Sequence, residues 1–321
     1  MDNVIAVKDM RVLEINCKYM GLPTSLLMEN AGSFIAREII KRFTGKKRSV
    51  GVVIGKGGKA GDALVMSRHL LFNDFDVTIY LLSKEITHPD TRNNLNIIKK
   101  YTDVVIKEYK PGQTFSEDII VDGILGLGVR APIGGVFLSA IKSINRSEGY
   151  KVSIDVPSGI DPETGELLGE EAVKADLTIT LHAIKPGLIK AKDYVGEVVV
   201  ANIGIPPSFH RFVGPGDIIV RVRRKETKAK KGDGGRILVI GGSKDYVGAP
   251  WLAALGAWYA GADIVTLLAP SPVVRNRFSA EIICSEVSSE IFNEDHISKA
   301  IELAKKHHVV ILGPGMGVSE D

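Results

Sequence analysis

A run of small and charged residues, Gly55-Lys56-Gly57-Gly58-Lys59-Ala60-Gly61-Asp62-Ala63, has the composition of a loop that brings the backbone close to a ligand. Glycines allow such an approach, and free N–H groups at a helix start attract anions. The run is not a Walker A loop, because Gly57 stands where that motif has Ser or Thr. It matches GxGxxA only loosely, so a dinucleotide-binding loop and a tight strand-to-helix turn both stay open.

Two aspartates each end a predicted strand: Asp122 in IIVDGILGLGVRAPIGG and Asp155 in SIDVPSGIDPETG. Open α/β sheets bind ligands at the carboxyl ends of their strands. The turn that follows Asp155 carries Ser158, whose hydroxyl could contact a cation or a phosphate. Two aspartates side by side would concentrate negative charge, which raises a carboxyl pKa or attracts a cation. A purely structural role in capping the next turn stays open for each aspartate.

Weaker candidates follow other strands. His182 and Lys185 come directly after the predicted strand 177–181 and could flank a ligand. In the C-terminal part, the run GGSKDYVGAP and the run LGPGMG, which ends at Gly317, each follow a strand. Neither glycine turn is specific alone, but together at corresponding strand ends they suggest one nucleotide cleft.

Alternating helices and strands must position these residues. The runs 49–55 and 119–126 are rich in Val and Ile, as in parallel strands covered on both faces. Further strands are predicted at 77–82, 151–159, 177–181 and 197–205, and helices at 8–20, 25–43, 62–72, 90–100 and 136–145. The fold class is therefore α/β, with a three-layer αβα, Rossmann-like N-terminal domain and a mostly parallel sheet.

A change of composition marks a domain boundary. Prolines and glycines cluster after residue 205, and a basic run lies between Arg221 and Arg236. We read residues 1–215 and 216–321 as two domains. The basic run is either a solvated linker or a surface for phosphorylated ligands. The second domain has few strand signals, which predicts an incomplete α/β domain.

Bulk properties exclude several classes of protein. The net charge of +3 gives no support for nucleic-acid binding, and the two cysteines, Cys17 and Cys284, favour neither a disulfide framework nor a zinc site. The N-terminal residues are charged throughout and no run is apolar enough for a membrane helix. We therefore expect a cytoplasmic protein with neither nucleic acid nor membrane as partner. The apolar N-terminal helices would suit a homo-oligomer, or equally internal packing.

Four motifs in order resemble the NAD(P)H-hydrate epimerase family: SLLMENAG, the glycine loop before GDALVMSRHL, IIVDGILGLG, and IDVPSGIDPETG with KADLTITL. The resemblance covers nearly all of residues 1–215. The run GDGGRILVIGGSKDYVGAPWLAALGAWYAGADIVTLLAP, with ILGPGMG, resembles the start of the ADP/ATP-dependent NAD(P)H-hydrate dehydratase family, which has a ribokinase-like fold. That family's later GTGD-type nucleotide loop is absent from these residues.

The resemblance implies a function in the repair of nicotinamide nucleotides. The substrates would be the hydrates of NADH and NADPH, NADHX and NADPHX. The first domain would interconvert the S and R forms of the hydroxyl at C6, and the full-length protein would dehydrate the S form with ADP or ATP. By resemblance, Asp155 is the catalytic acid/base, and Asp122 and Ser158 hold a K⁺ ion. Substrate contacts are implied at Asp155, Gly58, Lys59, Ala60, Gly61, Asp62, Gly126, Leu127, Gly128, Val129, Arg130, Ala131 and Pro132, and in the second domain at Ala249 and Gly317.

One residue departs from the family pattern. The family loop carries two asparagines and two glycines before its aspartate, whereas this chain has Lys59 where the potassium-binding asparagine is expected. An ammonium so close to a bound K⁺ would be repelled strongly. Either Lys59 replaces the metal ion and contacts the phosphate, or the site has lost epimerase activity. The second case would make the protein a non-catalytic nucleotide-binding or scaffolding module. A dehydrogenase is a third reading, with Glu85 as its only ribose-binding acid and no hydride-transfer residues beside it.

Overall fold

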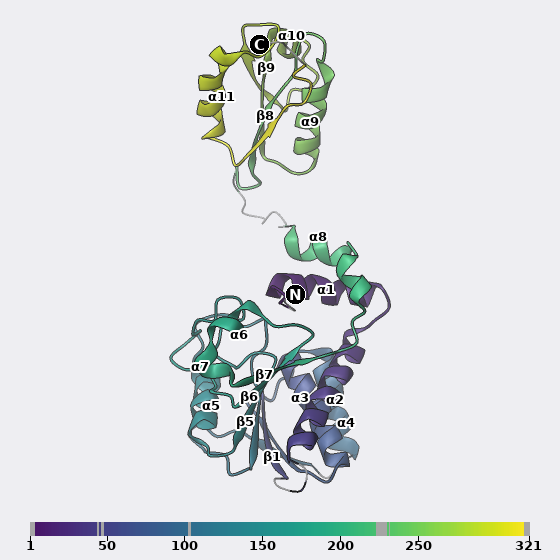
Figure 1. The fold of residues 1–321 in the computed structure, drawn as a ribbon, viewed down its shortest axis with the longest axis vertical. Helices are drawn as coiled ribbons and strands as arrows, with labels where there is room; N and C mark the ends of the chain where they lie inside the picture. Colours follow the sequence, from purple (N-terminus) through teal and green to yellow (C-terminus); the bar gives the residue numbers. More distant parts are fainter. Residues whose placement is uncertain are drawn as a thin grey trace. The chain divides into compact units, whose positions relative to one another are not determined.

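The computed structural model describes residues 4–43, 45, 48–101, 104–222, 230 and 232–317. The chain forms two compact units, Met1–Val222 and Arg223–Asp321 (Figure 1). The boundary at residue 215 stays a prediction about family domains. Most of the basic run between Arg221 and Arg236 lies outside the described residues, so both of its interpretations also stay predictions.

The first unit is built on a seven-stranded sheet in the order β3-β2-β1-β4-β5-β6-β7. Every neighbouring pair in it is parallel. The strands are β1 (Ser49–Ile54), β2 (Asp76–Leu81), β3 (Val105–Glu108), β4 (Ile119–Gly123), β5 (Tyr150–Ile154), β6 (Leu177–Leu181) and β7 (Glu197–Ala201). Strands β1 to β3 are added toward one edge of the sheet and β4 to β7 toward the other, so the strand order reverses between β1 and β4. Parallel sheets of this type form a ligand crevice at that point.

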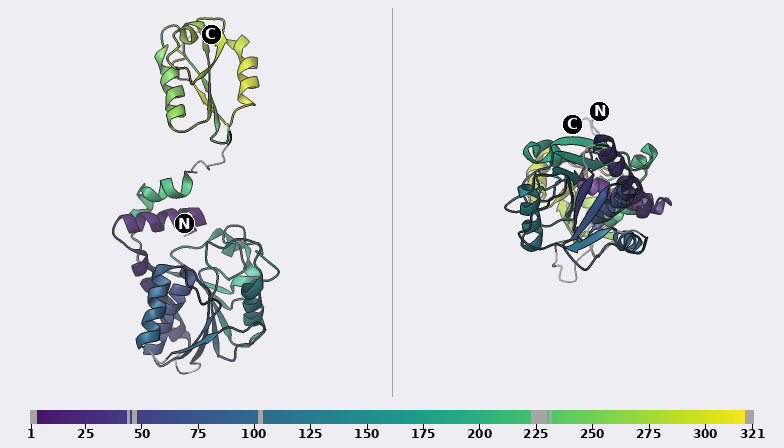
Figure 2. Two further views of the ribbon diagram at one scale, coloured as in Figure 1. Left: turned by 180° about the vertical axis from the view of Figure 1, so that it is seen from behind. Right: turned by 90° about the horizontal axis from the view of Figure 1, so that it is seen from below.

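Helices cover both faces of this sheet, so the predicted three-layer αβα arrangement is confirmed. Figures 1 and 2 show α2, α3 and α4 on one face and α5, α6 and α7 on the other. The helices of the unit are α1 (Val7–Tyr19), α2 (Thr24–Phe43), α3 (Gly58–Phe72), α4 (Pro89–Tyr101), α5 (Gly135–Arg146), α6 (Pro186–Lys190), α7 (Lys192–Val195), the 3₁₀ helix η1 (Pro207–Arg211) and α8 (Pro215–Arg221).

The apolar strand residues form the core between these layers. Val50, Val52, Ile119 and Val121 are fully buried and belong to one cluster that also takes in residues of α2 and α3. Burial on both faces explains why β1 and β4 have no polar alternation in the sequence. This core fixes the carboxyl ends of the central strands in place.

The start of α3 differs from the prediction. The sequence suggested a glycine turn up to Gly61 with a helix from Asp62, but the helix begins at Gly58. Gly61 serves packing, because a Cβ there would lie 2.4 Å from the Met28 Cε atom and 2.6 Å from the Thr91 Oγ1 atom. Lys59 is therefore in the first helical turn and not in a loop.

Part of the Pro- and Gly-rich segment read as the domain boundary is helical. Helix α8 packs along α1, and buried Asn16 joins them. The Asn16 Oδ1 atom accepts a 2.8 Å hydrogen bond from the Gly216 N–H, and its Nδ2 donates to Asp217 Oδ2 at 3.1 Å. The Pro and Gly residues here begin a helix, since proline fits the first helical turn.

The second unit contains a four-stranded sheet in the order β10-β9-β8-β11, with every pair parallel. Its strands are β8 (Arg236–Ile240), β9 (Ile264–Pro270), β10 (Ile283–Val287) and β11 (Val309–Leu312), and its helices are α9 (Gly248–Tyr259), α10 (Ser271–Arg275), η2 (Glu294–His296) and α11 (Ile297–Ala304). A second, smaller α/β unit is thus confirmed. Strand β10 was not predicted.

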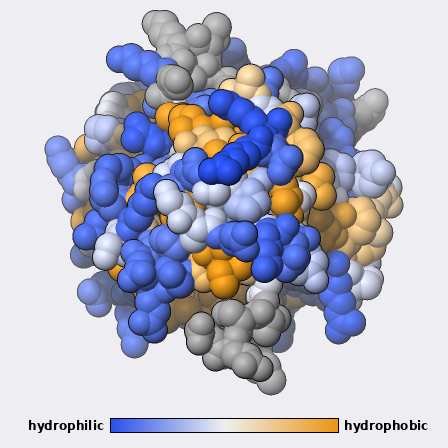
Figure 3. All heavy atoms as spheres, turned by 90° about the horizontal axis from the view of Figure 1, so that it is seen from above, coloured by the Kyte–Doolittle hydropathy of each residue, from blue (hydrophilic) through white to orange (hydrophobic). Residues whose placement is uncertain are grey.

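Apolar side chains are exposed on this unit. Leu252, Tyr259 and Leu312 are among the large hydrophobic residues that face solvent, and Figure 3 shows hydrophobic patches among hydrophilic ones on the face it views. Within the described residues, no helix has the length and hydrophobicity needed to cross a membrane.

Candidate functional site

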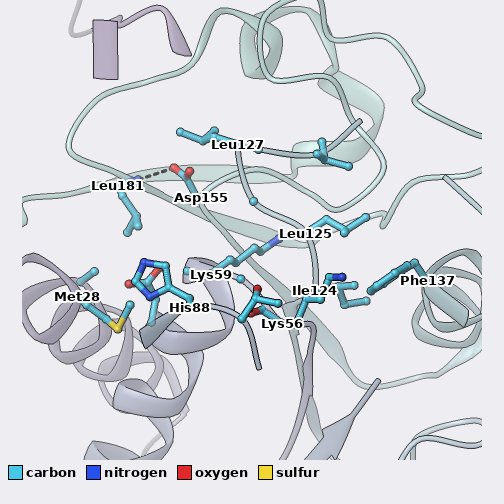
Figure 4. Close-up of a pocket in the computed structure, with 18 of the residues that line it drawn as sticks. Met28, Lys56, Lys59, His88, Ile124, Leu125, Leu127, Phe137, Asp155 and Leu181 are labelled. Atoms are coloured by element: carbon cyan, nitrogen blue, oxygen red, sulfur yellow. Dashed lines mark hydrogen bonds between the residues drawn. The ribbon is translucent and has the colours of Figure 1, made fainter. Parts of the chain in front are cut away.

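A cavity of about 730 Å³ opens in the first unit, beside the carboxyl ends of β1, β4, β5 and β6. Its lining comes from the first turn of α3, the loop after β4, the end of β5 and parts of α1 and α2. Figure 4 shows Lys59 extending from the helix side toward the loop that carries Leu125, with Asp155 on the opposite wall. The candidate residues from separate motifs therefore meet at one place, the edge of the sheet where ligands are expected.

Lys59 is the unusual group of this site. The side chain is only 2% exposed. Its Nζ atom donates to the Asp122 Oδ2 atom at 2.9 Å, to the Val156 carbonyl oxygen at 2.8 Å and to the Ser158 Oγ atom at 3.1 Å. Lys59 thus ties the start of α3 to the residues that end β4 and follow β5.

Asp122 lies at the centre of a dense hydrogen-bond cluster. Besides Lys59, its carboxylate accepts hydrogen bonds from the Ser153 hydroxyl at 3.0 Å, the Ser158 N–H at 2.8 Å, the Ser158 hydroxyl at 2.6 Å and the Ile124 N–H at 3.1 Å. Five donors on one buried carboxylate leave it no role as a proton donor or acceptor for a ligand. Asp122 therefore organises the cluster.

The partners of Lys59 show which protonation state the site is built for. The Ser158 hydroxyl directs its hydrogen to Asp122 and so offers a lone pair to the lysine, as do the Val156 carbonyl and the Asp122 carboxylate. Three acceptors need three N–H donors, which only the ammonium form has. Burial lowers the pKa of Lys59 from its ordinary value, while the charge of Asp122 and the hydrogen bond to it oppose this. The three-acceptor geometry matches the charged form.

The cluster also tests whether a K⁺ ion fits. Asp122 and Ser158 are the residues at which the family resemblance places that ion, and the Lys59 ammonium contacts both. A second monovalent cation on the same oxygens would lie within a few ångströms of the ammonium, in a buried place where like charges repel strongly. The residues present do not fit a bound K⁺.

Asp155 is held on the cavity wall by a strained backbone and a buried cation. Its φ of 64° is in the left-handed region that non-glycine residues seldom adopt, a feature that clusters at functional sites. Its Oδ1 atom forms an ion pair with Lys185 Nζ, which is fully buried, and accepts the Leu181 N–H at 3.1 Å (Figure 4). The Oδ2 atom has no protein donor among the described residues, so it is available to a ligand.

Two further carboxyl groups share the cavity with Asp155. Burial raises the pKa of Glu14 to about 7, and the Asp155 charge adds to that effect. Burial also raises the pKa of Asp62 well above its usual range, again with Asp155 and Glu14 contributing. Asp155 is paired with a lysine, whereas Glu14 and Asp62 keep a proton more readily. Together these three carboxyl groups can both give and take protons.

The predicted substrate-contacting residues divide into three groups. Those that line the cavity are Gly58, Lys59, Asp62, Gly126, Leu127, Gly128, Val129, Arg130, Pro132 and Asp155. Ala60 and Gly61 are buried in α3, and Ala131 is exposed to solvent and does not line the cavity. The two residues predicted to hold K⁺, Asp122 and Ser158, are buried and do not line the cavity, but both contact Lys59, which does.

Sequence reasoning missed Glu14 and rated Lys185 as only a weak candidate. Glu14 had a signal, because it falls on the buried stripe of α1 with Met10 and Cys17, where a charge is unexpected. Lys185 had only its position after a strand as a signal, since its contact with Asp155 depends on the turn after β6. The other weak candidate, His182, instead stacks on His210 with ring centroids 4.9 Å apart.

In the second unit, the two predicted glycine turns do lie together. The Gly242 N–H donates to the Pro314 carbonyl at 2.8 Å, and these turns follow the neighbouring strands β8 and β11. A Cβ at Gly315 would lie 3.1 Å from the Ala249 Cβ atom. Ligand contacts at Ala249 and Gly317 stay predictions.

The fold and the cavity define a Rossmann-like α/β protein with a cavity at the carboxyl edge of a parallel sheet. Residues 24–187 match the profile of the family described as YjeF-related protein N-terminus, and residues 237–321 match that described as NAD(P)H-hydrate dehydratase. The chain belongs to the family of YjeF-related proteins. Both family resemblances seen in the sequence motifs are thereby confirmed.

Named relatives agree with this assignment. The chain is 45% identical over 315 residues to the bifunctional NAD(P)H-hydrate repair enzyme Nnr of Archaeoglobus fulgidus, covering 98% of this chain and 66% of the relative. It is 38% identical to the protein of the same name from Hyperthermus butylicus, covering all of this chain and 61% of the relative. The chain thus spans about two thirds of the length of these relatives.

A shorter relative corresponds to the first unit. The NAD(P)H-hydrate epimerase of Cenarchaeum symbiosum is 41% identical over 212 residues, which is 65% of this chain and 99% of that protein. The crystal structure of yeast ynu0 is similar with a TM-score of 0.55 and 21% identity, over 64% of this chain and 91% of that one. This last likeness concerns the fold alone.

Proposed function

We propose that the first unit is an NAD(P)H-hydrate epimerase, which interconverts the S and R forms of the hydroxyl at C6 of NADHX and NADPHX. The observation that carries the proposal is the placement of Asp155. Its carboxylate faces the cavity, has one oxygen without a protein donor among the described residues, and is paired with a buried lysine. The 41% identity to a protein named NAD(P)H-hydrate epimerase along its whole length supports the same reaction.

The reaction needs a group that protonates a leaving hydroxyl and takes the proton back. In our proposal, Asp155 is the acid/base: it contacts the C6 hydroxyl, passes a proton to it and stabilises the positive charge that develops on the ring. Glu14, which also lines the cavity and whose pKa is raised to about 7, supplies that proton to Asp155. The C6–O bond breaks, the hydroxyl leaves as water, and the lone pair of ring N1 forms an iminium double bond.

The return step restores the substrate with either configuration. Water adds to C6 from one of the two faces of the planar ring, the new C6–O bond forms, and the released proton returns through Asp155 to Glu14. No atom or electron is gained or lost. A positioned acid/base of this kind contributes roughly 10²–10⁴-fold to a rate.

The second unit belongs to a different step in this proposal. Its match to the NAD(P)H-hydrate dehydratase family supports a role in removing water from the S form, with ADP or ATP as cosubstrate in the longer protein. The glycine turns at the ends of β8 and β11, with Ala249 and Gly317, are the proposed contacts. Epimerisation in the first unit would supply that step with the S form.

The test compares two aspartate variants of the whole chain. Purified R-NADPHX is incubated with wild type, Asp155→Asn and Asp193→Asn, and the S form is followed by chromatography against the uncatalysed rate. Asp193 is an exposed residue of α7, away from the cavity lining, and serves as the matched control. We expect wild-type turnover in the Asp193 variant and at least about a 100-fold loss in the Asp155 variant. Folded wild type without activity would reject the proposal and favour a binding module.

A further inference from the structure

The hydrogen bonds of Lys59 have a feature that a surface lysine lacks: every donor is used. An ammonium has three N–H groups, and here they go to a carboxylate, a carbonyl and a hydroxyl oxygen at 2.8–3.1 Å. The side chain is also shielded from solvent. An ammonium whose three N–H groups all go to oxygen atoms of the protein acts as a structural ion and not as a ligand-binding arm.

The three oxygen atoms belong to two segments that border the cavity, the end of β4 and the turn after β5. Asp122 ends β4, just before the loop that forms one cavity wall. Val156 and Ser158 follow Asp155 directly, and the Ser158 hydroxyl also accepts the Leu125 N–H at 2.9 Å. A positive charge at this point holds the Asp155 turn and the loop after β4 against the start of α3.

We propose that the Lys59 ammonium is a built-in monovalent cation of this site, so that the protein needs no K⁺ where its family resemblance implies one. Lys59 is a positioning residue: it orders the two loops around Asp155 through Asp122, Val156 and Ser158. It does not contact the substrate phosphate, because no N–H group remains for that contact. This differs from the expectation, drawn from sequence, of a direct phosphate contact.

Thermal stability tests the proposal without any substrate. The melting temperature of the first unit is measured in KCl, NaCl and choline chloride at one ionic strength, so that general screening is equal. Wild type is expected to melt at the same temperature in all three salts. A melting temperature that rises with K⁺ and saturates would show a bound K⁺ in wild type and would overturn the proposal.

Two substitutions at Lys59 sharpen the test. Lys59→Asn restores the family residue, and we expect its melting temperature to rise with KCl but not with choline chloride. Lys59→Met keeps the length of the side chain but removes the charge, and we expect a lower melting temperature that no salt restores. The exposed Lys110→Asn is the matched control and should behave as wild type.

Each substitution can also contradict the proposal. If Lys59→Asn gains nothing from K⁺, the ammonium does not stand at a cation site. If Lys59→Met is as stable as wild type, the ammonium does not hold the cluster together. Circular dichroism at low temperature shows whether each variant is folded before the salts are compared.

The consequence for turnover rests on the proposed epimerase function. Wild-type epimerisation should be unchanged between K⁺ and choline, whereas Lys59→Asn should need K⁺ for whatever activity it has. Absence of any epimerisation together with the expected melting pattern would reject the proposed function and leave the built-in cation standing. Wild-type turnover that depends on K⁺ would reject the built-in cation alone.

Discussion

Replacing Glu14 by glutamine should stabilise the first unit, and only above the pH at which this residue ionises in the unfolded chain. Burial is the main cause of its raised pKa, the charge of Asp155 adds to it, and Lys185 and Arg11 oppose it. Below pH 4.5 the carboxyl is protonated in both states and the substitution changes little. Between 4.5 and about 7 the unfolded chain loses the proton while the folded chain keeps it, so wild-type stability falls as the pH rises.

The size of the effect follows from the same pKa change. A change from 4.5 to about 7, at about 1.36 kcal/mol for each pH unit, corresponds to about 3 kcal/mol at pH 8. A neutral amide in place of the carboxyl does not have this penalty. For a domain of roughly 150–250 residues, about 3 kcal/mol shifts the melting temperature by about 6–12 °C.

The assay is thermal unfolding of wild type and Glu14→Gln at pH 5 and pH 8, followed by circular dichroism. The two tryptophans, Trp251 and Trp258, both belong to the second unit, so their fluorescence transition is an internal control that the substitution should not move. We expect a difference of about 1 kcal/mol or less at pH 5, which grows in favour of the variant to about 3 kcal/mol at pH 8. An equal difference at both values, or a less stable variant at pH 8, would refute the reasoning.

Two other substitutions probe the packing and charge of the same unit. Lys185→Met leaves the Asp155 carboxylate buried without its cation. We expect the free energy of unfolding to fall by about 3–5 kcal/mol and the rate of epimerisation to fall by at least about 100-fold. Unfolding and rate measurements that find wild-type stability and wild-type activity in this variant would contradict the role given to Lys185. Gly32→Ala places a Cβ 2.5 Å from the Val65 Cβ atom and should destabilise the first unit by about 1–3 kcal/mol. Gly256→Ala places its Cβ in open space on α9 and should stabilise the second unit by up to about 1 kcal/mol. Denaturant unfolding that ranks these two variants in the opposite order would refute the packing argument.

The sequence predicted the sheet well because the residues of its central strands carry a clear signal. The Val and Ile runs of β1 and β4 are buried on both faces, and burial leaves only apolar residues there. Elements with mixed signals were missed. The start of α3 was hidden because glycine is read as a turn residue, although Gly61 is needed for contact with Met28 and Thr91.

The composition of the candidate site was predicted better than its interactions. Asp122, Asp155 and Ser158 stood out because they follow strands, and Lys59 because it breaks a family pattern. That all three N–H groups of Lys59 are satisfied depends on atomic positions in three segments. The pairing of Lys185 with Asp155, and the raised pKa of Glu14, likewise arise from contacts between residues far apart in the chain.

The central claim joins an epimerase site at Asp155 to a cation that the protein itself supplies. The most direct measurement is the interconversion of purified R- and S-NADPHX by the wild-type chain in K⁺-free choline buffer. The account predicts interconversion well above the uncatalysed rate, with no increase when K⁺ replaces choline. Interconversion that begins only after K⁺ is added, or none in either buffer, would contradict it.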